Sequence, residues 1–273
     1  MLPRRPIAVL MAVYAKDDPE LFLRAMRSVF DQQLPDRFEI RVFLGIDGPL
    51  PARLATAVES VRPRLAGCTT SQVNLGLAAT LNRLLDALTN EELIFRMDAD
   101  DYSMPGRFLK QIQFMELHPE VDILGTAMLE IDSSGRSRIV RYADDSENLK
   151  KYIAWRTPVA HPTVCLRRCV FDAVGHYPLV PMNEDIALWF RCLERGLRFA
   201  NLKEPLYQFR VDERFFERRG REKALAEFRT FREGLRSLQA PPWRLLPPAI
   251  RLLFRFMPTW AQRVAYSLRS NRR

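Results

Sequence analysis

The chain has 273 residues, of which 47% are hydrophobic, and a formal net charge of +9. This composition excludes a disordered chain, and the length allows one large α/β domain or one domain with an extension. No uncharged apolar stretch reaches the ~18 residues of a transmembrane helix, and no small-residue cleavage site follows the apolar run 7–14. We therefore expect a cytoplasmic protein.

The positive charge is concentrated at the C-terminal end of the chain. Residues 214–273 contain 15 Lys and Arg and 4 Glu, a balance of +11. Residues 1–213 contain 27 Lys and Arg and 29 Asp and Glu, a balance of −2. This division predicts a nearly neutral domain over 1–213 and a basic extension over 214–273. It argues against a nucleic-acid partner and favours contact between the extension and an anionic surface.

Apolar runs and helical periodicity alternate in the first hundred residues. Continuous apolar runs predict buried strands at 7–13, 38–46, 71–73 and 93–95. Apolar residues at helical spacing predict helices at 19–30, 52–61 and 77–88. This alternation is typical of an α/β fold with a mainly parallel sheet and helices on both faces.

The second half of the chain continues this pattern less regularly. Helices are predicted at 105–117, 144–155 and 184–195. Strands are predicted at 121–131 and 137–142, and after the loop that begins at His161.

Polar residues follow three of the predicted strands. Asp47 and Asn74 come after the second and third strands, and Asp98, Asp100 and Asp101 come after the fourth. Ligands of parallel sheets bind beyond the carboxyl ends of the strands, so these side chains should meet at one edge. Asp98 and Asp100 alternate and would point to the same side of an extended chain. Such a pair suits Mg²⁺ or Mn²⁺, which prefer oxygen ligands; the alternative is a solvated acidic loop.

The common glycine-rich nucleotide-binding motifs are absent from the sequence. The loop after the first strand lacks G-x-G-x-x-G, and no G-x-x-x-x-G-K-[ST] occurs. A nucleotide bound here would therefore need a metal ion to handle its phosphates. Glu184 and Asp185 open the last predicted helix, where the simplest interpretation is that they complement the helix dipole.

Six segments, taken in order, resemble glycosyltransferase family 2. These segments are Val9 to Tyr14, Asp47-Gly48, Asn74 to Ala78, Arg96 to Asp101, His161-Pro162-Thr163 and Glu184-Asp185. The resemblance covers roughly residues 6–211 and implies an inverting enzyme of the GT-A fold that uses a nucleotide-sugar donor. His118-Pro119-Glu120, followed by Gly125-Thr126, is similar to the bacterial surface-polysaccharide branch of the family.

The resemblance also implies roles for individual residues. Asp100 would be the direct ligand of Mn²⁺ or Mg²⁺, and Asp98 would contact the metal or the ribose. Asp185 would be the general base, with Glu184 supporting it or touching the acceptor. Asp47 would accept a hydrogen bond from the uracil or the ribose. The implied nucleotide-sugar-binding residues are Ala12, Val13, Tyr14, Asp47, Asn74, Arg96, Asp98, Ala99 and Asp100.

Two departures from the family pattern affect the base contacts. The first loop has Ala15 and Lys16 after Tyr14, where many members have Tyr-Asn, and Pro49 follows Asp47-Gly48, where many have Asp-Asp-Gly-Ser. Neither departure touches the expected metal or base positions.

The sequence leaves the roles of three residues open. His161 could be a late metal ligand or an acceptor contact, or it could pack and hydrogen-bond before Pro162. Arg96 and Arg107 could contact phosphates or pair with the acidic cluster.

The extension also allows two interpretations. Residues 243–266 combine four arginines with many aromatic and aliphatic residues, and no acid follows Glu233. This profile is typical of helices that lie in a membrane interface. The alternative is a helical pair that packs on the domain with its arginines in solvent.

The resemblance, together with the acidic cluster, implies a metal-dependent transferase that moves a hexose or N-acetylhexosamine from a nucleotide sugar, UDP-linked, to a glycan acceptor. The acceptor is expected to be lipid-linked, and the enzyme to be peripheral at the inner face of the cell membrane. Two rival functions are a sugar-phosphate nucleotidyltransferase and a non-catalytic sugar- or partner-binding module at a membrane. The first needs a glycine-rich N-terminal loop, which 13–19 lacks. The second would be favoured by loss of the acids, which are all present.

Overall fold

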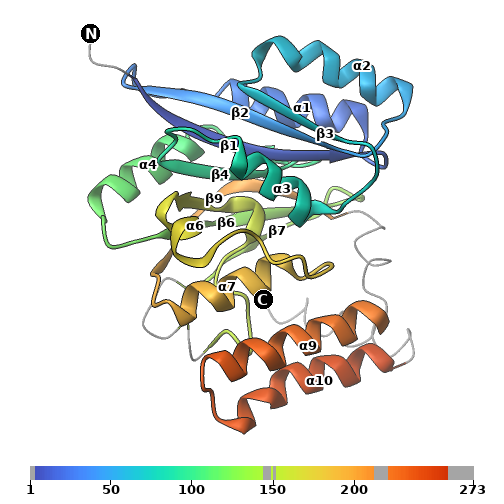
Figure 1. Ribbon diagram of the computed structural model, residues 1–273, viewed down its shortest axis with the longest axis vertical. Coiled ribbons are helices and arrows are strands. Elements are labelled where there is room, and N and C mark those ends of the chain that lie inside the picture. The colour runs from blue at the N-terminus through green and yellow to red at the C-terminus, as the bar shows by residue number, and fades with distance from the viewer. Residues whose placement is uncertain (1–3, 144–148, 150–151, 212–220, 258–273) are drawn as a thin grey trace.

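The computed structural model describes residues 4–143, 149, 152–211 and 221–257. In this part of the chain, a mixed sheet lies between layers of helices (Figure 1). The strand order is β3-β2-β1-β4-β8-β6-β9-β5, with β7 paired to β6.

The first half of the sheet is parallel. Its strands are β1 (Arg5–Tyr14), β2 (Phe38–Asp47), β3 (Gly67–Ser71) and β4 (Leu93–Asp98). Val9 lies between Val42 of β2 and Phe95 of β4, so β1 is central and buried on both faces. This position explains its continuous apolar run, because a strand covered on both sides has no polar face.

The second half of the sheet is mixed. Antiparallel β8 (Cys165–Arg167) joins β4 to β6 (Ile123–Asp132), and β9 (Phe199–Val211) runs parallel to β6. Two short strands, β5 (Tyr102–Ser103) and β7 (Ser137–Val140), complete it. The predicted fold class, a mixed and mainly parallel sheet with flanking helices, is confirmed.

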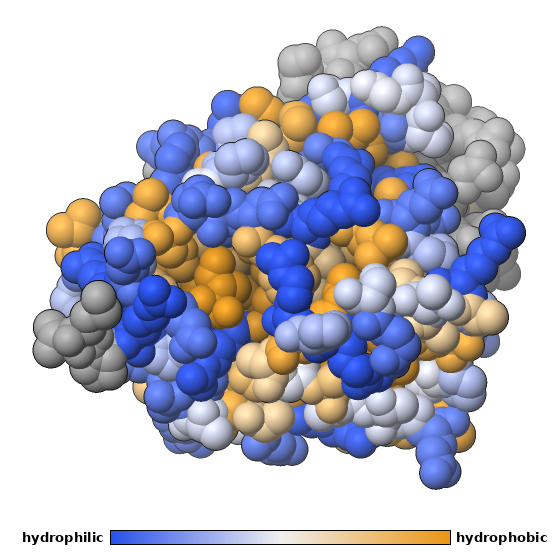
Figure 2. Space-filling view, turned by 90° about the horizontal axis from the view of Figure 1, so that it is seen from above, coloured by the Kyte–Doolittle hydropathy of each residue, from blue (hydrophilic) through white to orange (hydrophobic). Residues whose placement is uncertain are grey.

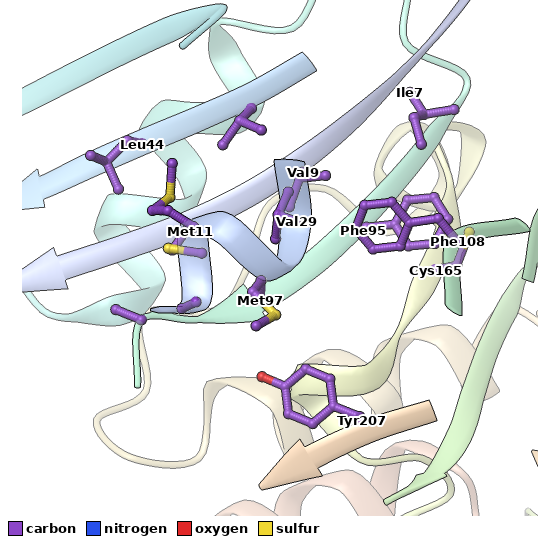
Figure 3. Packing of buried hydrophobic residues seen from close by; sticks show 14 of the residues in the cluster. Ile7, Val9, Met11, Val29, Leu44, Phe95, Met97, Phe108, Cys165 and Tyr207 are labelled. Carbon is purple, nitrogen blue, oxygen red and sulfur yellow. The ribbon is translucent and has the colours of Figure 1, made fainter. Parts of the chain in front are cut away.

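Helices cover both faces of the sheet. The first face holds α1 (Pro19–Phe30), α2 (Ala52–Val61) and α4 (Arg107–Leu117). The second holds α3 (Leu77–Asp86), α6 (Cys169–Val174) and α7 (Glu184–Glu194). On the first face, the rings of Phe95 and Phe108 lie 4.4 Å apart beside Cys165 (Figure 3). This packing holds α4 on the strand that ends at the acidic cluster.

The C-terminal extension contains a helical pair, α9 (Arg221–Ser237) and α10 (Leu246–Phe256), joined through η3 (Pro242–Leu245). The pair lies below α7 in Figure 1. Phe231 of α9 meets Phe190 of α7 edge to face, with ring centroids 5.5 Å apart. A Cβ atom at Gly234 would lie 2.1 Å from Cγ of Phe190, so glycine permits the close approach of the two helices. The hydrophobic core on the second face of the sheet, called the second core below, therefore continues through α7 into α9.

Most predicted elements agree with the structure to within two or three residues, but the short strand at 71–73 is wrong. The observed β3 ends at Ser71, opposite Asp47, and Val73 is 61% exposed. The chain turns at this point, where the Ser71 hydroxyl donates a hydrogen bond to the carbonyl of Val73.

One predicted helix differs in extent, and another is largely untested. The helix at 105–117 begins at Arg107, because Gly106 adopts a left-handed conformation with φ of 77°. The helix at 144–155 lies largely outside the described residues. None of the described helices combines the length and apolar character that crossing a bilayer requires.

Candidate active site

A cavity of about 510 Å³ opens at the carboxyl ends of β1, β2 and β4. Nine of the sequence-predicted site residues line it together: Ala12, Val13, Tyr14, Asp47, Asn74, Asp98, Ala99, Asp100 and Glu184. The parallel strands explain this convergence, because their carboxyl ends share one edge of the sheet. Three predicted residues, Arg96, His161 and Asp185, lie outside its lining.

The loop after β1 is shaped by an acid inside it. Asp17 accepts a hydrogen bond from the Tyr14 backbone N–H at 2.9 Å and also lines the cavity. The next residue, Asp18, caps α1 by accepting from the backbone N–H groups of Glu20 and Leu21. Asp17 thus closes the loop and Asp18 starts the helix. The hydrogen bond from Tyr14 to Asp17 fixes the backbone of Tyr14 at the cavity.

Asp47 organises a second loop across the cavity. Its carboxylate accepts hydrogen bonds from the backbone N–H groups of Leu75, at 2.7 Å, and Gly76, at 3.0 Å. Gly76 has a φ of 89°, and a Cβ atom at Gly48 would lie 2.9 Å from the backbone nitrogen of Asn74. Asp47 therefore holds the path of this loop, whatever it also contacts in a ligand.

The acidic cluster at the end of β4 has partners on β4 and β9. Asp98 forms an ion pair with the buried Arg96, and its backbone N–H donates to the Tyr207 hydroxyl at 3.2 Å. Asp101 turns away from the cavity and accepts from the backbone N–H of Arg210 at 2.9 Å. Burial, together with the charges of Asp98 and Asp100, raises the pKa of Asp101 well above its ordinary value. Asp98 and Asp100 are thus the two carboxylates of the cluster at the cavity.

Arg107 stabilises the base of this cluster from within the core. Its side chain is fully buried and donates to the backbone carbonyl groups of Arg96, at 3.1 Å, and Pro162, at 3.2 Å. Burial lowers the pKa of Arg107 to about 10, and its guanidinium lies 4.8 Å from the Tyr207 ring. In this structure, Arg96 pairs with the acidic cluster, and Arg107 ties β4 to the segment around Pro162. Contact of Arg96 with a phosphate stays a prediction.

A second pair of carboxylates opens α7. Glu184 lines the cavity and Asp185 follows it in the first turn of the helix. Burial is the main cause that raises the pKa of both carboxyl groups, while the charges of Arg96 and Lys223 oppose the rise. A carboxylate whose pKa is raised in this way is a better proton acceptor than a solvated one.

His161 lies behind the cavity lining, in the second core. Its Nε2 atom is 3.0 Å from the Tyr177 hydroxyl, and its ring meets Trp189 edge to face at 6.0 Å. Burial lowers the pKa of His161 well below its ordinary value, so the ring is neutral. The structure thus gives one ring nitrogen a hydroxyl partner, and a metal role for His161 stays a prediction.

The donor set at the cavity suits a hard divalent cation that is also held by substrate. Within the described residues, no three His, Cys, Asp or Glu side chains are grouped closely enough to hold a metal ion alone. Asp98 and Asp100 nevertheless present two carboxylates at one place. Mg²⁺ and Mn²⁺ are commonly held by one or two carboxylates, with phosphate oxygens and waters completing the shell. The residues present therefore fit such an ion.

Several cavity residues were missed by the sequence analysis. The segment Leu179 to Met182 lines the cavity, and Met182 has a φ of 62°. The position of this segment, separated from Glu184 by Asn183 alone, could have indicated this. Arg210 of β9 and Lys223 of α9 add two cations. No local pattern marks Lys223, because only the packing of α9 on α7 brings it to the site.

Comparison with known sequences assigns the chain to a family. The sequence profile described as Glycosyl transferase family 2 matches residues 8–175. An amylovoran biosynthesis glycosyltransferase, AmsE of Erwinia amylovora, is 31% identical over 95% of this chain and 97% of its own length. A UDP-Gal:alpha-D-GlcNAc-diphosphoundecaprenol beta-1,3-galactosyltransferase of Escherichia coli is 31% identical over 78% of this chain and 77% of its own.

Solved structures share the fold. A Pyrobaculum calidifontis mannosyltransferase in complex with GDP-Man and Mn²⁺ superposes with a TM-score of 0.64 at 16% identity, over 98% of this chain and 80% of that one. TarS of S. aureus superposes with a TM-score of 0.62 at 19% identity, over 93% of this chain but only 44% of the longer TarS chain. With the matched profile and relatives of similar length, these findings confirm the predicted resemblance: the chain belongs to glycosyltransferase family 2 and is a glycosyltransferase of the GT-A fold.

Proposed function

We propose that this enzyme transfers a hexose or N-acetylhexosamine from a UDP-sugar to a hydroxyl of a lipid-linked glycan acceptor. The product would serve the synthesis of a bacterial cell-surface polysaccharide. The observation that carries the proposal is that Asp98 and Asp100, at and just after the end of β4, line one cavity with Glu184 of α7, and Asp185 follows Glu184 in the first turn of that helix. A transfer with inversion needs one base beside the acceptor hydroxyl, and a metal ion held by carboxylates can neutralise the charge on the leaving phosphates.

The donor end of the site is the edge formed by β1, β2 and β4. Ala12 to Tyr14, Asp47 and Asn74 line the cavity there and are the proposed contacts of the nucleoside. Asp98 and Asp100 would hold Mn²⁺ or Mg²⁺ against the diphosphate. That ion would neutralise the charge that develops on the leaving phosphates. Support for this donor class comes from the Escherichia coli relative, whose name specifies UDP-Gal.

The acceptor end of the site is the start of α7. The acceptor hydroxyl oxygen forms a bond to the anomeric carbon while the bond from that carbon to the phosphate oxygen breaks. Asp185 takes the hydroxyl proton, and Glu184 orients the acceptor. The raised pKa of both acids supports this assignment, because proton transfer is most effective when the pKa of the base approaches the working pH. A single displacement of this kind converts an α-linked donor into a β-glycoside.

The names of two relatives support the proposed acceptor class. The Escherichia coli relative is named for an acceptor sugar carried on diphosphoundecaprenol, and the Erwinia relative for amylovoran biosynthesis. A lipid-linked acceptor requires the enzyme to work at the inner face of the cell membrane. The basic extension over 214–273 would hold it there.

A donor screen tests the proposed function. The full chain is incubated with individual UDP-, GDP- and TDP-sugars, a diphospholipid-linked acceptor sugar and Mn²⁺, and release of nucleoside diphosphate is measured. One UDP-sugar should support release that depends on both acceptor and metal, and NMR of the product should show a β-linkage. Release that persists undiminished in excess chelator would contradict the metal assignment. An α-linked product from an α-linked donor would contradict single displacement.

A further inference from the structure

The outer face of α10 carries a continuous apolar stripe. Three exposed residues form it within α10: Leu246 (59%), Ile250 (51%) and Leu253 (69%). They follow one another at intervals of four and three residues, which places them on one side of the helix. Exposed Trp243 (73%) of η3 and Met257 (46%), directly after α10, flank them along the chain. A surface helix usually turns such a face toward the core, so its exposure here indicates a surface that meets another apolar phase.

The opposite face of α10 is fixed to the domain. Pro247 and Pro248 are buried, and Arg251 forms an ion pair with Glu227 of α9 at 3.3 Å. The Arg251 guanidinium also donates to the backbone carbonyl of Ala154 at 2.8 Å. The apolar stripe therefore faces outward because the other side of the helix is already occupied.

Aromatic and basic residues accompany the stripe. Trp155 and Tyr152 are 61% and 54% exposed, and they belong to the segment that Arg251 holds. Arg244 and Arg255 lie on the same helical stretch as the stripe, and no acid follows Glu233 in the chain. Tryptophan, tyrosine and arginine around an apolar face is the composition of helices that lie at the boundary between headgroups and acyl chains.

We propose that this face of α10, with Trp155 and Tyr152 beside it, docks into the interface of an anionic bilayer. The proposal rests on the membrane location within the proposed function and names the surface that would provide it. A second copy of the chain is a poorer occupant of the face. Pairing two such faces would bring arginines together with no acid of the same stretch to oppose them. An anionic lipid surface complements both the apolar stripe and its positive surroundings.

Docking through α10 would also orient the active site. α9 packs between α10 and α7, and it carries Lys223 to the cavity beside Glu184. The docking helix and the helix that bears the proposed base are therefore connected by packed side chains.

Figure 2 views the molecule from the side of α2, where hydrophilic side chains dominate the outline and hydrophobic ones form smaller groups.

Vesicle binding of full-length variants tests the docking surface. The double variant Ile250→Glu, Leu253→Glu should bind vesicles of mixed phosphatidylglycerol and phosphatidylcholine at least about tenfold more weakly than the parent chain, because it places charges in the apolar phase. The variant Arg244→Gln should lose up to about fivefold at low salt and little at high salt. Co-sedimentation at both salt concentrations measures these differences.

Matched controls separate the face from general effects of charge. Leu117→Glu changes an even more exposed leucine, 77% exposed, at the end of α4, and Arg53→Gln removes an exposed arginine of α2. Both controls should bind vesicles like the parent chain. Circular dichroism, together with transfer to a water-soluble acceptor, should show that the double variant remains folded and active. A failure of the proposed function would remove transfer from the parent chain itself and leave the vesicle result intact.

Two outcomes would overturn the docking proposal. In the first, the double variant and the parent chain bind vesicles equally. In the second, the parent chain is a dimer by analytical ultracentrifugation, the double variant is a monomer, and neither binds vesicles. The second outcome would assign the face to contact between copies of the chain.

Discussion

Two pairs of neighbouring carboxylates lie at or beside the cavity, and the groups that surround the two pairs differ. At the end of β4, Asp98 is paired with the buried Arg96, and the neighbouring Asp101 is turned toward the backbone of Arg210. At the start of α7, neither acid has an arginine in direct contact among the described ion pairs, and burial raises the pKa of both. The first arrangement keeps charge available for a cation. The second raises the pKa of the carboxyl groups, so that they exchange protons at a pH closer to neutrality.

The difference shows why acidic residues alone do not indicate a role. Both pairs lie within one cavity region, and both would be described from the sequence as two acids close together. Their surroundings separate them, because Asp98 has the buried Arg96 as an ion-pair partner, whereas burial at the start of α7 raises the pKa of Glu184 and Asp185. The following predictions test this division, beginning with the change of largest expected effect.

Removal of Asp100, the proposed direct metal ligand, should have the largest effect. Asp100→Ala should reduce transfer by about 10³-fold, because the charge on the leaving phosphates would lose its counter-ion. Donor affinity, measured by calorimetry, should also become insensitive to Mn²⁺. Asp172→Ala, which removes an exposed acid of α6, is the control and should behave like the parent chain. Turnover near the parent rate in Asp100→Ala would remove the metal role from this pair.

Replacement of the proposed base should affect the rate and leave donor binding unchanged. Asp185→Asn preserves the shape of the side chain and removes its basicity, so the rate of transfer should fall by roughly 10²-fold or more. Glu184→Gln should have a smaller effect on the rate and a larger one on the KM for the acceptor. Steady-state kinetics with both substrates varied measures the two parameters. An inactive Glu184→Gln beside an active Asp185→Asn would reverse the two roles.

A change in the contact between α9 and α7 tests whether the second pair depends on the extension. Gly234→Ala places a methyl group against the Phe190 ring and should lower the free energy of unfolding by about 1–3 kcal/mol. Urea unfolding measures this loss. Arg236→Ala, at an exposed position on the same helix, should change the free energy of unfolding by less than about 0.5 kcal/mol. Equal stability of the two variants would indicate that α9 is only loosely attached to α7.

The smallest predicted effect concerns the pH dependence of the α7 pair. The proposed base must be ionised, so the rate should fall as the pH drops through its raised pKa. The charges of Lys223 and Arg96 hold that pKa down against burial, and neighbouring Glu184 competes for the same proton. Lys223→Met should therefore move the acidic limb of the pH–rate profile to higher pH by up to about one pH unit. Lys223→Arg and the distant Lys110→Met should leave the limb in place, and an unmoved limb in Lys223→Met would contradict the coupling.

The parallel half of the sheet and the donor edge were predictable because their signals are local. The apolar runs of β1, β2 and β4 mark buried strands, and parallel strands bring the residues after them to one edge. The position of β3 was predicted wrongly. It is an edge strand with the sequence Gly67 to Ser71, only partly buried, so it carries no apolar run. The more apolar residues just beyond it, including Val73, belong to the exposed turn.

The remaining parts of the site depend on contacts between distant segments. Arg107 occupies the first turn of a helix, where an arginine is ordinarily solvated, and only the fold encloses it between β4 and the Pro162 segment. Lys223 reaches the cavity because Phe231 and Gly234 seat α9 on α7. No spacing rule within one segment contains such information. The membrane role of the extension was suggested by its composition and stays a prediction.

The way in which Asp47 holds the loop at 74–76 bears on how this enzyme could change over evolutionary time. The carboxylate grips main-chain N–H groups, which every residue type except proline supplies, and leaves the side chain of Leu75 half exposed. Substitutions at position 75 would alter the surface that a donor meets while the anchor remains in place. Such a loop can accumulate new side chains without a loss of folding, and it gives laboratory selection for altered sugar preference a place to begin.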